Sequence, residues 1–294
     1  MLQPNIETFI GCDSDYDHAH MVLYGAPFDS TTSFRPGARF GPSSMRHESF
    51  GLETYSPYQN ADLTDCAVFD SGDLELCFGR AESALQDIEA RAAEILEDGK
   101  FPLLLGGEHL VTLGAVRAMV KKYPDLHIVH FDAHADLRSQ YEGSIYSHAS
   151  VMHRAVADLG LPLAQFAMRD FCREEVEVRR QYNVLHYDAD VLFRQGLPEQ
   201  PLPADFPRRL YITFDVDGLD ASLMPATGTP SPGGLFWHQA LLLIERCLQG
   251  RSMVGMDVVE LAPLPGLHHA DFTAAKLTHA LMGFAQRAGL PRKA

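Results

Sequence analysis

The residues best suited to chemistry in this chain are Asp132, His134 and Asp136, which stand at alternate positions. They follow the apolar run 126–129, which is typical of a short buried strand. Side chains in an extended backbone alternate between two sides, so these three project to the same side. Carboxylates and an imidazole in this arrangement predict half of a metal site just past the end of a strand.

Two further apolar runs end in residues of the same kind. The run 210–214 leads into Asp215 and Asp217, and the run 101–105 leads through Gly-Gly-Glu to His109. Burying one unpaired carboxylate costs on the order of several kcal/mol or forces its protonation. Four aspartates at strand ends therefore need two divalent cations, with the two histidines completing the ligand sets. In the alternative interpretation, each aspartate separately caps a helix or lies solvated in a loop.

The ligand types narrow the choice of metal. Oxygen and imidazole ligands without thiolate favour Mn²⁺ over Fe²⁺, Co²⁺, Ni²⁺ or Zn²⁺, and Mg²⁺ rarely takes two histidines. A pair of divalent ions acidifies water enough for hydrolysis near neutral pH.

Alternating strands and helices are expected to position these residues. There is no break in composition and no internal repeat, which predicts one domain over residues 1–294. The class is α/β, with a mainly parallel sheet covered on both faces, and ligands bind at the carboxyl ends of such strands. We expect strands at 20–24, 101–105, 126–131, 166–168, 184–187, 210–214 and 253–259, and helices at 80–98, 110–122, 173–181, 237–248 and 270–287.

Composition excludes several classes of protein. No apolar run approaches the ~18–20 residues of a membrane span, and the N-terminus lacks a secretory pattern, so a cytoplasmic location is expected. The five cysteines are scattered and lack C-x-x-C spacing, as expected of reduced thiols. A net charge of −15 argues against nucleic acid as a partner and mildly favours a small cationic substrate.

Four separated motifs resemble the ureohydrolases, the arginase and agmatinase family, which remove urea from guanidino compounds. They are GGEH at 106–109, FDAHADL at 131–137, FDVDGLD at 214–220 and DVVELAP at 257–263. The resemblance extends from Gly25 to about Gly283. It implies the arginase-like three-layer αβα sandwich, two Mn²⁺ per subunit and a homo-oligomer, either a trimer or a hexamer.

The resemblance also implies how the ligands are shared. Asp132 and Asp215 would bridge the two ions. The first ion would be held by His109, Asp132, Asp136 and Asp215, and the second by Asp132, His134, Asp215 and Asp217.

Three residues are candidates for catalysis. Asp136 lies beside the bridging position and could pass a proton to the departing amine. His148 matches the family's proton-shuttle position, and an imidazole with a pKa near 6.5 suits that task. Glu260 could hold a flat guanidinium by paired, charge-assisted hydrogen bonds. His148 and Glu260 are therefore also the expected substrate-binding residues; the alternatives are an ordinary loop histidine and an ordinary strand-end glutamate.

Several other residues receive structural assignments. Asp257 should face away from Glu260, and His127 and His130 are expected in the core or behind the ligands. The pair His268–His269 is not expected to form a separate metal clamp. The loop 27–42 is long enough to be functional, or else to pack on another subunit, and the role of 263–270 is open.

Agmatine, split by water into putrescine and urea as in polyamine biosynthesis, is the expected substrate. The stretches 33–37, 51–58 and 106–110 resemble bacterial agmatinases, and Tyr146 stands where arginases have Asn. The chain departs from agmatinases at 167–170, at 220–221 and at 222–227. The alternatives are 4-guanidinobutyrase, guanidinopropionase or arginase activity, a deacetylase-type amide hydrolase, and a non-catalytic metal-binding relative.

Overall fold

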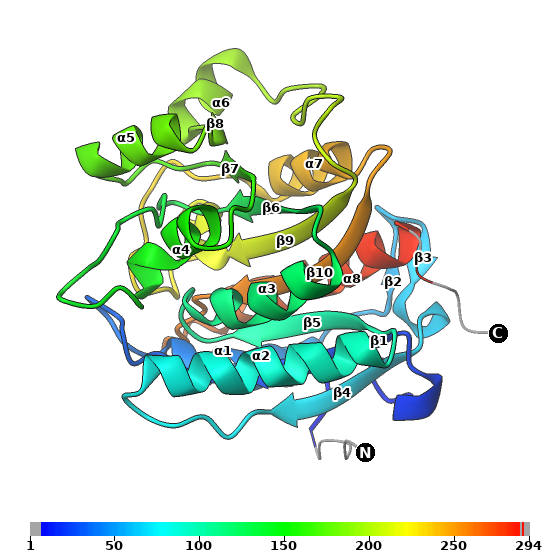
Figure 1. The fold of residues 1–294 in the computed structure, drawn as a ribbon. Helices are drawn as coiled ribbons and strands as arrows, with labels where there is room; N and C mark the ends of the chain where they lie inside the picture. The colour runs from blue at the N-terminus through cyan, green and yellow to red at the C-terminus, as the bar shows by residue number, and fades with distance from the viewer. Residues whose placement is uncertain (1–6, 289, 291–294) are drawn as a thin grey trace.

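The computed structural model describes residues 7–288 and 290, and its centre is an eight-stranded sheet (Figure 1). The strands lie in the order β4-β1-β5-β10-β9-β6-β7-β8, and every neighbouring pair is parallel. Their bounds are β1 (Met21–Ala26), β4 (Val68–Asp73), β5 (Phe101–Gly106), β6 (Leu126–Phe131), β7 (Leu163–Phe166), β8 (Leu185–Tyr187), β9 (Arg209–Asp215) and β10 (Ser252–Val259).

Helices cover both faces of this sheet (Figure 1). One face carries α2 (Ala81–Glu97), α3 (Val111–Lys122), α4 (Val151–Ala157) and α5 (Arg173–Gln181). The other carries α1 (Gly41–Ser49), α7 (Trp237–Cys247) and α8 (His268–Arg287). Leu192 of α6 (Ala189–Gln195) packs in the same apolar cluster as these helices. Successive residues of a strand point to opposite faces: Leu103 and Leu105 pack in one apolar cluster and Leu104 in the other. The predicted three-layer α/β architecture is confirmed.

The sequence pattern did not predict β4, α1, α4, α6 or the short hairpin of β2 (Tyr55–Ser56) and β3 (Ala61–Asp62). Strand β4 lacks a continuous apolar run because it carries Asp70, which is buried and paired with Arg46 at 2.8 Å. A buried ion pair of this kind is formed by tertiary packing and leaves no local periodicity. The short helices offer too few turns for an apolar stripe to be recognised.

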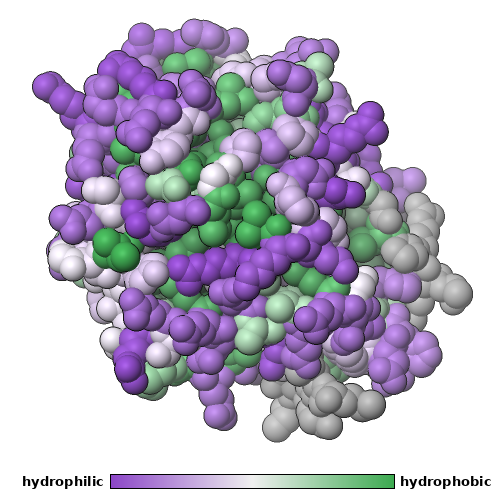
Figure 2. Space-filling model, viewed as in Figure 1, coloured by the Kyte–Doolittle hydropathy of each residue, from purple (hydrophilic) through white to green (hydrophobic). Residues whose placement is uncertain are grey.

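The surface agrees with the charged composition. The face shown in Figure 2 is covered mostly by hydrophilic residues, with hydrophobic side chains in recesses between them. No helix in the described part of the chain is long and apolar enough to cross a membrane.

Candidate metal centre

Four adjacent strands at the centre of the sheet supply the candidate site. Strands β5, β10, β9 and β6 are neighbours, and their parallel direction brings their carboxyl ends to one edge. His109 follows β5, the segment 132–136 follows β6, and Glu260 follows β10. Asp215 ends β9, and Asp217 lies in the 3-10 turn η5 (Val216–Gly218) that follows it.

The first group of donors surrounds His109. Its Nδ1 lies 3.0 Å from an oxygen of Asp132, 3.2 Å from one of Asp136 and 3.4 Å from one of Asp215. All four side chains are buried. Carboxylates from two separate sequence motifs therefore converge on one nitrogen of a third motif.

The second group surrounds His134. Its Nδ1 lies 3.3 Å from Asp132 Oδ1 and 3.1 Å from Asp217 Oδ2. Asp132 turns Oδ2 toward His109 and Oδ1 toward His134, so it belongs to both groups. Asp215 turns Oδ2 toward His109, while its Oδ1 accepts a hydrogen bond from the Asp217 backbone at 2.8 Å. Of the two residues expected to bridge, Asp132 faces both histidines, and Asp215 faces His109 and the Asp217 backbone.

The orientation of His109 tests whether the donors fit a metal. Its Nε2 lies 2.9 Å from Thr213 Oγ1, and the Thr213 hydroxyl donates to Asp257 at 2.6 Å. The hydroxyl proton is used on Asp257, so Thr213 accepts a hydrogen bond from Nε2–H, and the hydrogen-bond network assigns the lone pair to Nδ1. Nδ1 is buried and makes no hydrogen bond with the described residues. A lone pair facing carboxylate oxygens fits a cation between them.

Electrostatics lead to the same conclusion. Burial and the charge of Asp132 raise the pKa of Asp136 to about 7. Burial, with the charges of Asp217 and Asp132, raises the pKa of Asp215 well above its usual range. Burial acts to lower the pKa of His109, but the three aspartates that surround it outweigh this effect and raise the pKa overall. The cluster therefore lacks positive charge, which divalent cations would supply.

A cavity of about 310 Å³ opens beside these donors. His134, Asp136 and His148 line it together with Ser33, Arg138 and Tyr141. His148 was expected to have an ordinary pKa, but burial and the nearby His134 and His109 lower it to about 4. The structure thus brings the proposed shuttle residue to the same cavity as two proposed ligands.

Glu260 lies behind the cluster and does not line this cavity. Its Oε1 accepts a hydrogen bond from the His109 backbone at 2.7 Å. Burial and the charge of Glu108 raise the pKa of Glu260 well above its usual range. Glu260 and Asp136 also have positive φ angles of 68° and 53°. Such conformations cost about 1–3 kcal/mol each and cluster at functional sites.

Other residues support the donors from behind. His130 Nε2 lies 2.7 Å from Asp132 Oδ2, and His130 Nδ1 lies 3.1 Å from Gln165. His130 therefore contacts a ligand from behind, one of the two places expected for it. Sequence reasoning missed Thr213. It assigned Asp257 a structural role because Asp257 was expected to face away from Glu260. The signal available was two polar residues inside otherwise apolar strands.

The structure places the other singled-out histidines outside the donor groups. His268 and His269 begin α8, and the Nδ1 of His268 lies 3.9 Å from Glu48. His127 packs against Phe206, with 4.8 Å between the ring centroids. Neither arrangement brings them to the donors.

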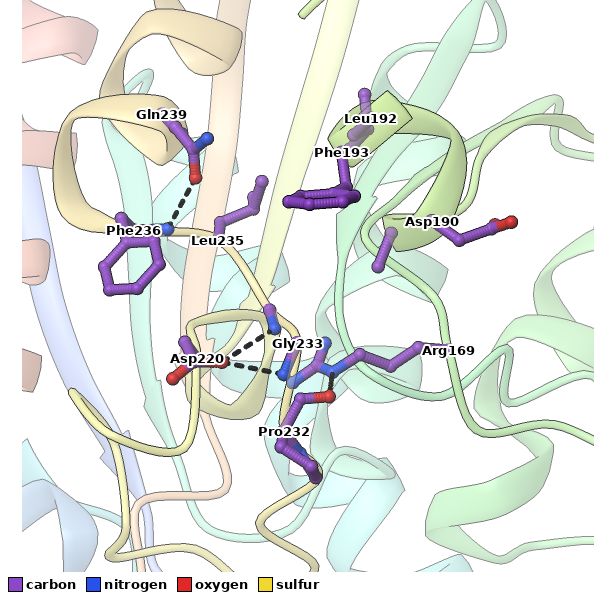
Figure 3. A pocket seen from close by; sticks show the side chains of 12 residues that line it. Arg169, Asp190, Leu192, Phe193, Asp220, Pro232, Gly233, Leu235, Phe236 and Gln239 are labelled. Carbon is purple, nitrogen blue, oxygen red and sulfur yellow. Dashed lines mark hydrogen bonds between the residues drawn. The ribbon is translucent and has the colours of Figure 1, made fainter. Parts of the chain in front are cut away.

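A larger cavity of about 510 Å³ lies between α6 and the start of α7 (Figure 3). Phe193 and Phe236 border it, and Asp220 accepts hydrogen bonds there from the backbones of Gly233 and Gly234. Arg169 also borders it and donates to the Asp217 carbonyl at 2.6 Å. None of the proposed metal ligands lines this cavity.

Comparisons with known proteins agree with this arrangement. The arginase family model matches residues 19–283. The chain is 42% identical over 270 residues to an agmatinase of Bacillus subtilis, covering 91% of each protein. It is 37% identical over 271 residues to an N(1)-aminopropylagmatine ureohydrolase of Thermus thermophilus, covering 92% of each. The crystal structure of agmatine ureohydrolase of Thermoplasma volcanium matches with a TM-score of 0.87 at 34% identity, covering 96% of this chain and 95% of that one.

Proposed function

This chain belongs to the arginase family, and from that premise we propose that it is a metal-dependent ureohydrolase that splits agmatine into putrescine and urea. The observation that carries the proposal is the convergence of three carboxylates on Nδ1 of His109. The similarity to proteins named agmatinase supports the choice of substrate. We further propose that the enzyme works in the cytoplasm as a homotrimer or homohexamer of single-domain subunits.

The proposed metals are two Mn²⁺, as the donor chemistry favours. When bound, such a pair supplies an acidified water for hydrolysis near neutral pH. His109, Asp132, Asp136 and Asp215 would hold one ion, and Asp132, His134, Asp215 and Asp217 the other.

The remaining steps fall to side chains of this chain. Glu260 would hold the flat guanidinium, since one of its carboxylate oxygens is fixed by the His109 backbone and the group is buried among acids. Asp136, which borders the cavity, would deliver a proton to the departing amine. His148, on the same cavity wall, would exchange protons with solvent.

A second substrate is suggested by a specific comparison. Two of the similar proteins are N(1)-aminopropylagmatine ureohydrolases of Thermus thermophilus, at 37% and 36% identity. That compound carries the same guanidino group on a longer polyamine, so the same donors would serve it.

Urea release tests both candidates. The purified enzyme is incubated with Mn²⁺ and agmatine, N(1)-aminopropylagmatine, arginine or 4-guanidinobutyrate. We expect agmatine to have the highest kcat/KM, by at least about tenfold, a difference of about 1.4 kcal/mol in transition-state binding. A chelator should abolish the activity and added Mn²⁺ should restore it. No urea from any of the four compounds would contradict the proposed function, and a higher value for N(1)-aminopropylagmatine would favour the second substrate.

A further inference from the structure

We propose that Thr31 and Ser33 position His148, which makes the loop after β1 part of the proton-transfer apparatus. The inference rests on the proposed function, because that function gives His148 its role. Both hydroxyl residues would act through the imidazole, so they are positioning residues.

The loop is anchored on the turn that leads to His109. Glu108 is fully buried, and its carboxylate accepts hydrogen bonds from the Thr31 backbone at 2.7 Å and the Thr31 hydroxyl at 2.5 Å. The Glu108 backbone donates to the Phe28 carbonyl at 2.7 Å. A Cβ on Gly107 would lie 2.0 Å from that carbonyl oxygen, so only glycine allows this close approach. The start of the loop is therefore held against the metal-site turn.

The rest of the loop is closed upon itself. The buried carboxylate of Asp29 accepts a hydrogen bond from the Gly37 backbone at 2.9 Å and pairs with the guanidinium of Arg39. A charge-assisted pair with a buried carboxylate is stronger than an exposed pair. Ser33 lies in sequence between Asp29 and Gly37, so these contacts fix the segment that contains it.

Two residues of this loop hold His148 at two points. Thr31 Oγ1 accepts a hydrogen bond from the His148 backbone at 3.0 Å, and Ser33 Oγ lies 3.1 Å from His148 Nε2. Ser33 and His148 both line the cavity that also contains His134 and Asp136. A hydrogen bond to one ring nitrogen of a histidine sets the ring's orientation and its tautomer. Removal of the Ser33 hydroxyl should therefore release the ring without opening the cluster.

A double-mutant cycle tests the inference. Urea release from agmatine is measured with Mn²⁺ for wild type, Ser33→Ala, His148→Asn and the double variant. Ser33→Ala should lower kcat about tenfold with KM changed less than about twofold, and it should have no further effect once His148 is replaced. Ser33→Thr, which keeps the hydroxyl, should stay within about threefold of wild type. Ser43→Ala is the matched control, because Ser43 is exposed in the first turn of α1, just after the same loop, and its hydroxyl donates to the Phe40 carbonyl.

An unchanged kcat in Ser33→Ala would overturn the inference. It would also be overturned if the fold-loss of kcat in the double variant equalled the product of the losses in the two single variants. The second result would mean that Ser33 acts independently of His148. Crystal structures of wild type and Ser33→Ala give a readout that needs no turnover. The His148 ring should rotate or occupy more than one rotamer in the variant, and an unchanged ring would also overturn the inference. An enzyme that releases no urea would overturn the proposed function alone, since the position of the ring remains measurable.

Discussion

At the scale of single residues, Asp132 joins the two groups of donors. It is fully buried, and its two oxygens face different histidines. His130 Nε2 lies 2.7 Å from it and the His134 backbone donates to it at 2.6 Å. Burial acts to raise the pKa of Asp132, but the neighbouring side chains of His130, His109 and His134 hold it well below the usual range. Asp132 is therefore ionised and ready to bind cations on both sides.

Asp132→Asn should lower urea release by at least about 100-fold, since even changes behind the ligands of metal sites cost 10–100-fold. The measurement is kcat/KM with saturating Mn²⁺. Asp125→Asn is the matched control, because Asp125 is a half-exposed carboxylate just before the same strand and pairs with Arg209. Full turnover of Asp132→Asn would contradict the bridging role.

Thr213→Val should weaken Mn²⁺ binding by about 10–100-fold. The change keeps the shape of the buried side chain but removes the hydroxyl that fixes His109 and bonds Asp257. Calorimetric titration with Mn²⁺ measures the effect, and Thr213→Ser should bind nearly as tightly as wild type. Equal affinities for the Val and Ser variants would show that the hydroxyl does not orient the histidine.

At the scale of elements, the turn that carries His109 depends on how α3 packs. Helix α3 lies against α2, and Gly114 faces Ile88 and Leu85. A Cβ at Gly114 would lie 2.8 Å from Ile88 and 2.9 Å from the Leu85 carbonyl oxygen. The fixed carbonyl cannot yield as a flexible side-chain end could, so the two helices would have to separate.

Gly114→Ala should lower the free energy of unfolding by about 1–3 kcal/mol because the added methyl overpacks the interface. At an exposed helix position the same change would stabilise by about 1 kcal/mol. Urea denaturation in the presence of a chelator measures this without a contribution from metal binding. Gln86→Ala, on the exposed side of α2, should change stability by less than about 0.5 kcal/mol. A stabilised Gly114→Ala variant would contradict the close packing.

At the scale of the whole molecule, folding buries histidines far from the metal site. His279 in α8 lies in the core, with its Nε2 2.8 Å from the Thr54 carbonyl oxygen. Burial lowers the pKa of His279. In the unfolded chain this residue takes up a proton near pH 6.5, while in the folded chain it stays neutral to lower pH. Its contribution to stability is therefore present above about pH 6.5 and lost as the pH falls toward the folded pKa.

The melting temperature of wild type should therefore fall more steeply than that of His279→Gln between pH 7.5 and 5.5. Because the unfolded chain binds at most one more proton at this residue than the folded chain, the free energy of unfolding changes by at most about 1.4 kcal/mol per pH unit. Glutamine keeps a donor for the Thr54 carbonyl but does not titrate. His18→Gln, at an exposed histidine, should follow wild type. Parallel curves for wild type and His279→Gln would contradict the assignment.

The sequence by itself determined which residues could bind metal and which kind of fold could bring them together. Ligand types at alternate positions, each after an apolar run, are local features, and the alternation of strands and helices follows from hydrophobic periodicity alone. From these features the six donors could be predicted without a structure, together with an α/β sandwich whose strand ends meet at one edge.

Only the tertiary structure decided how those donors are held. Thr213 contacts His109, and Thr31 and Ser33 contact His148. In each of these pairs the two residues are more than a hundred positions apart. The hydrogen bond between Thr31 and Glu108 likewise joins residues that are 77 positions apart. Each contact gives a buried polar group a hydrogen-bond partner. Such a group needs a protein partner only after folding has excluded water, so no local sequence pattern identifies that partner.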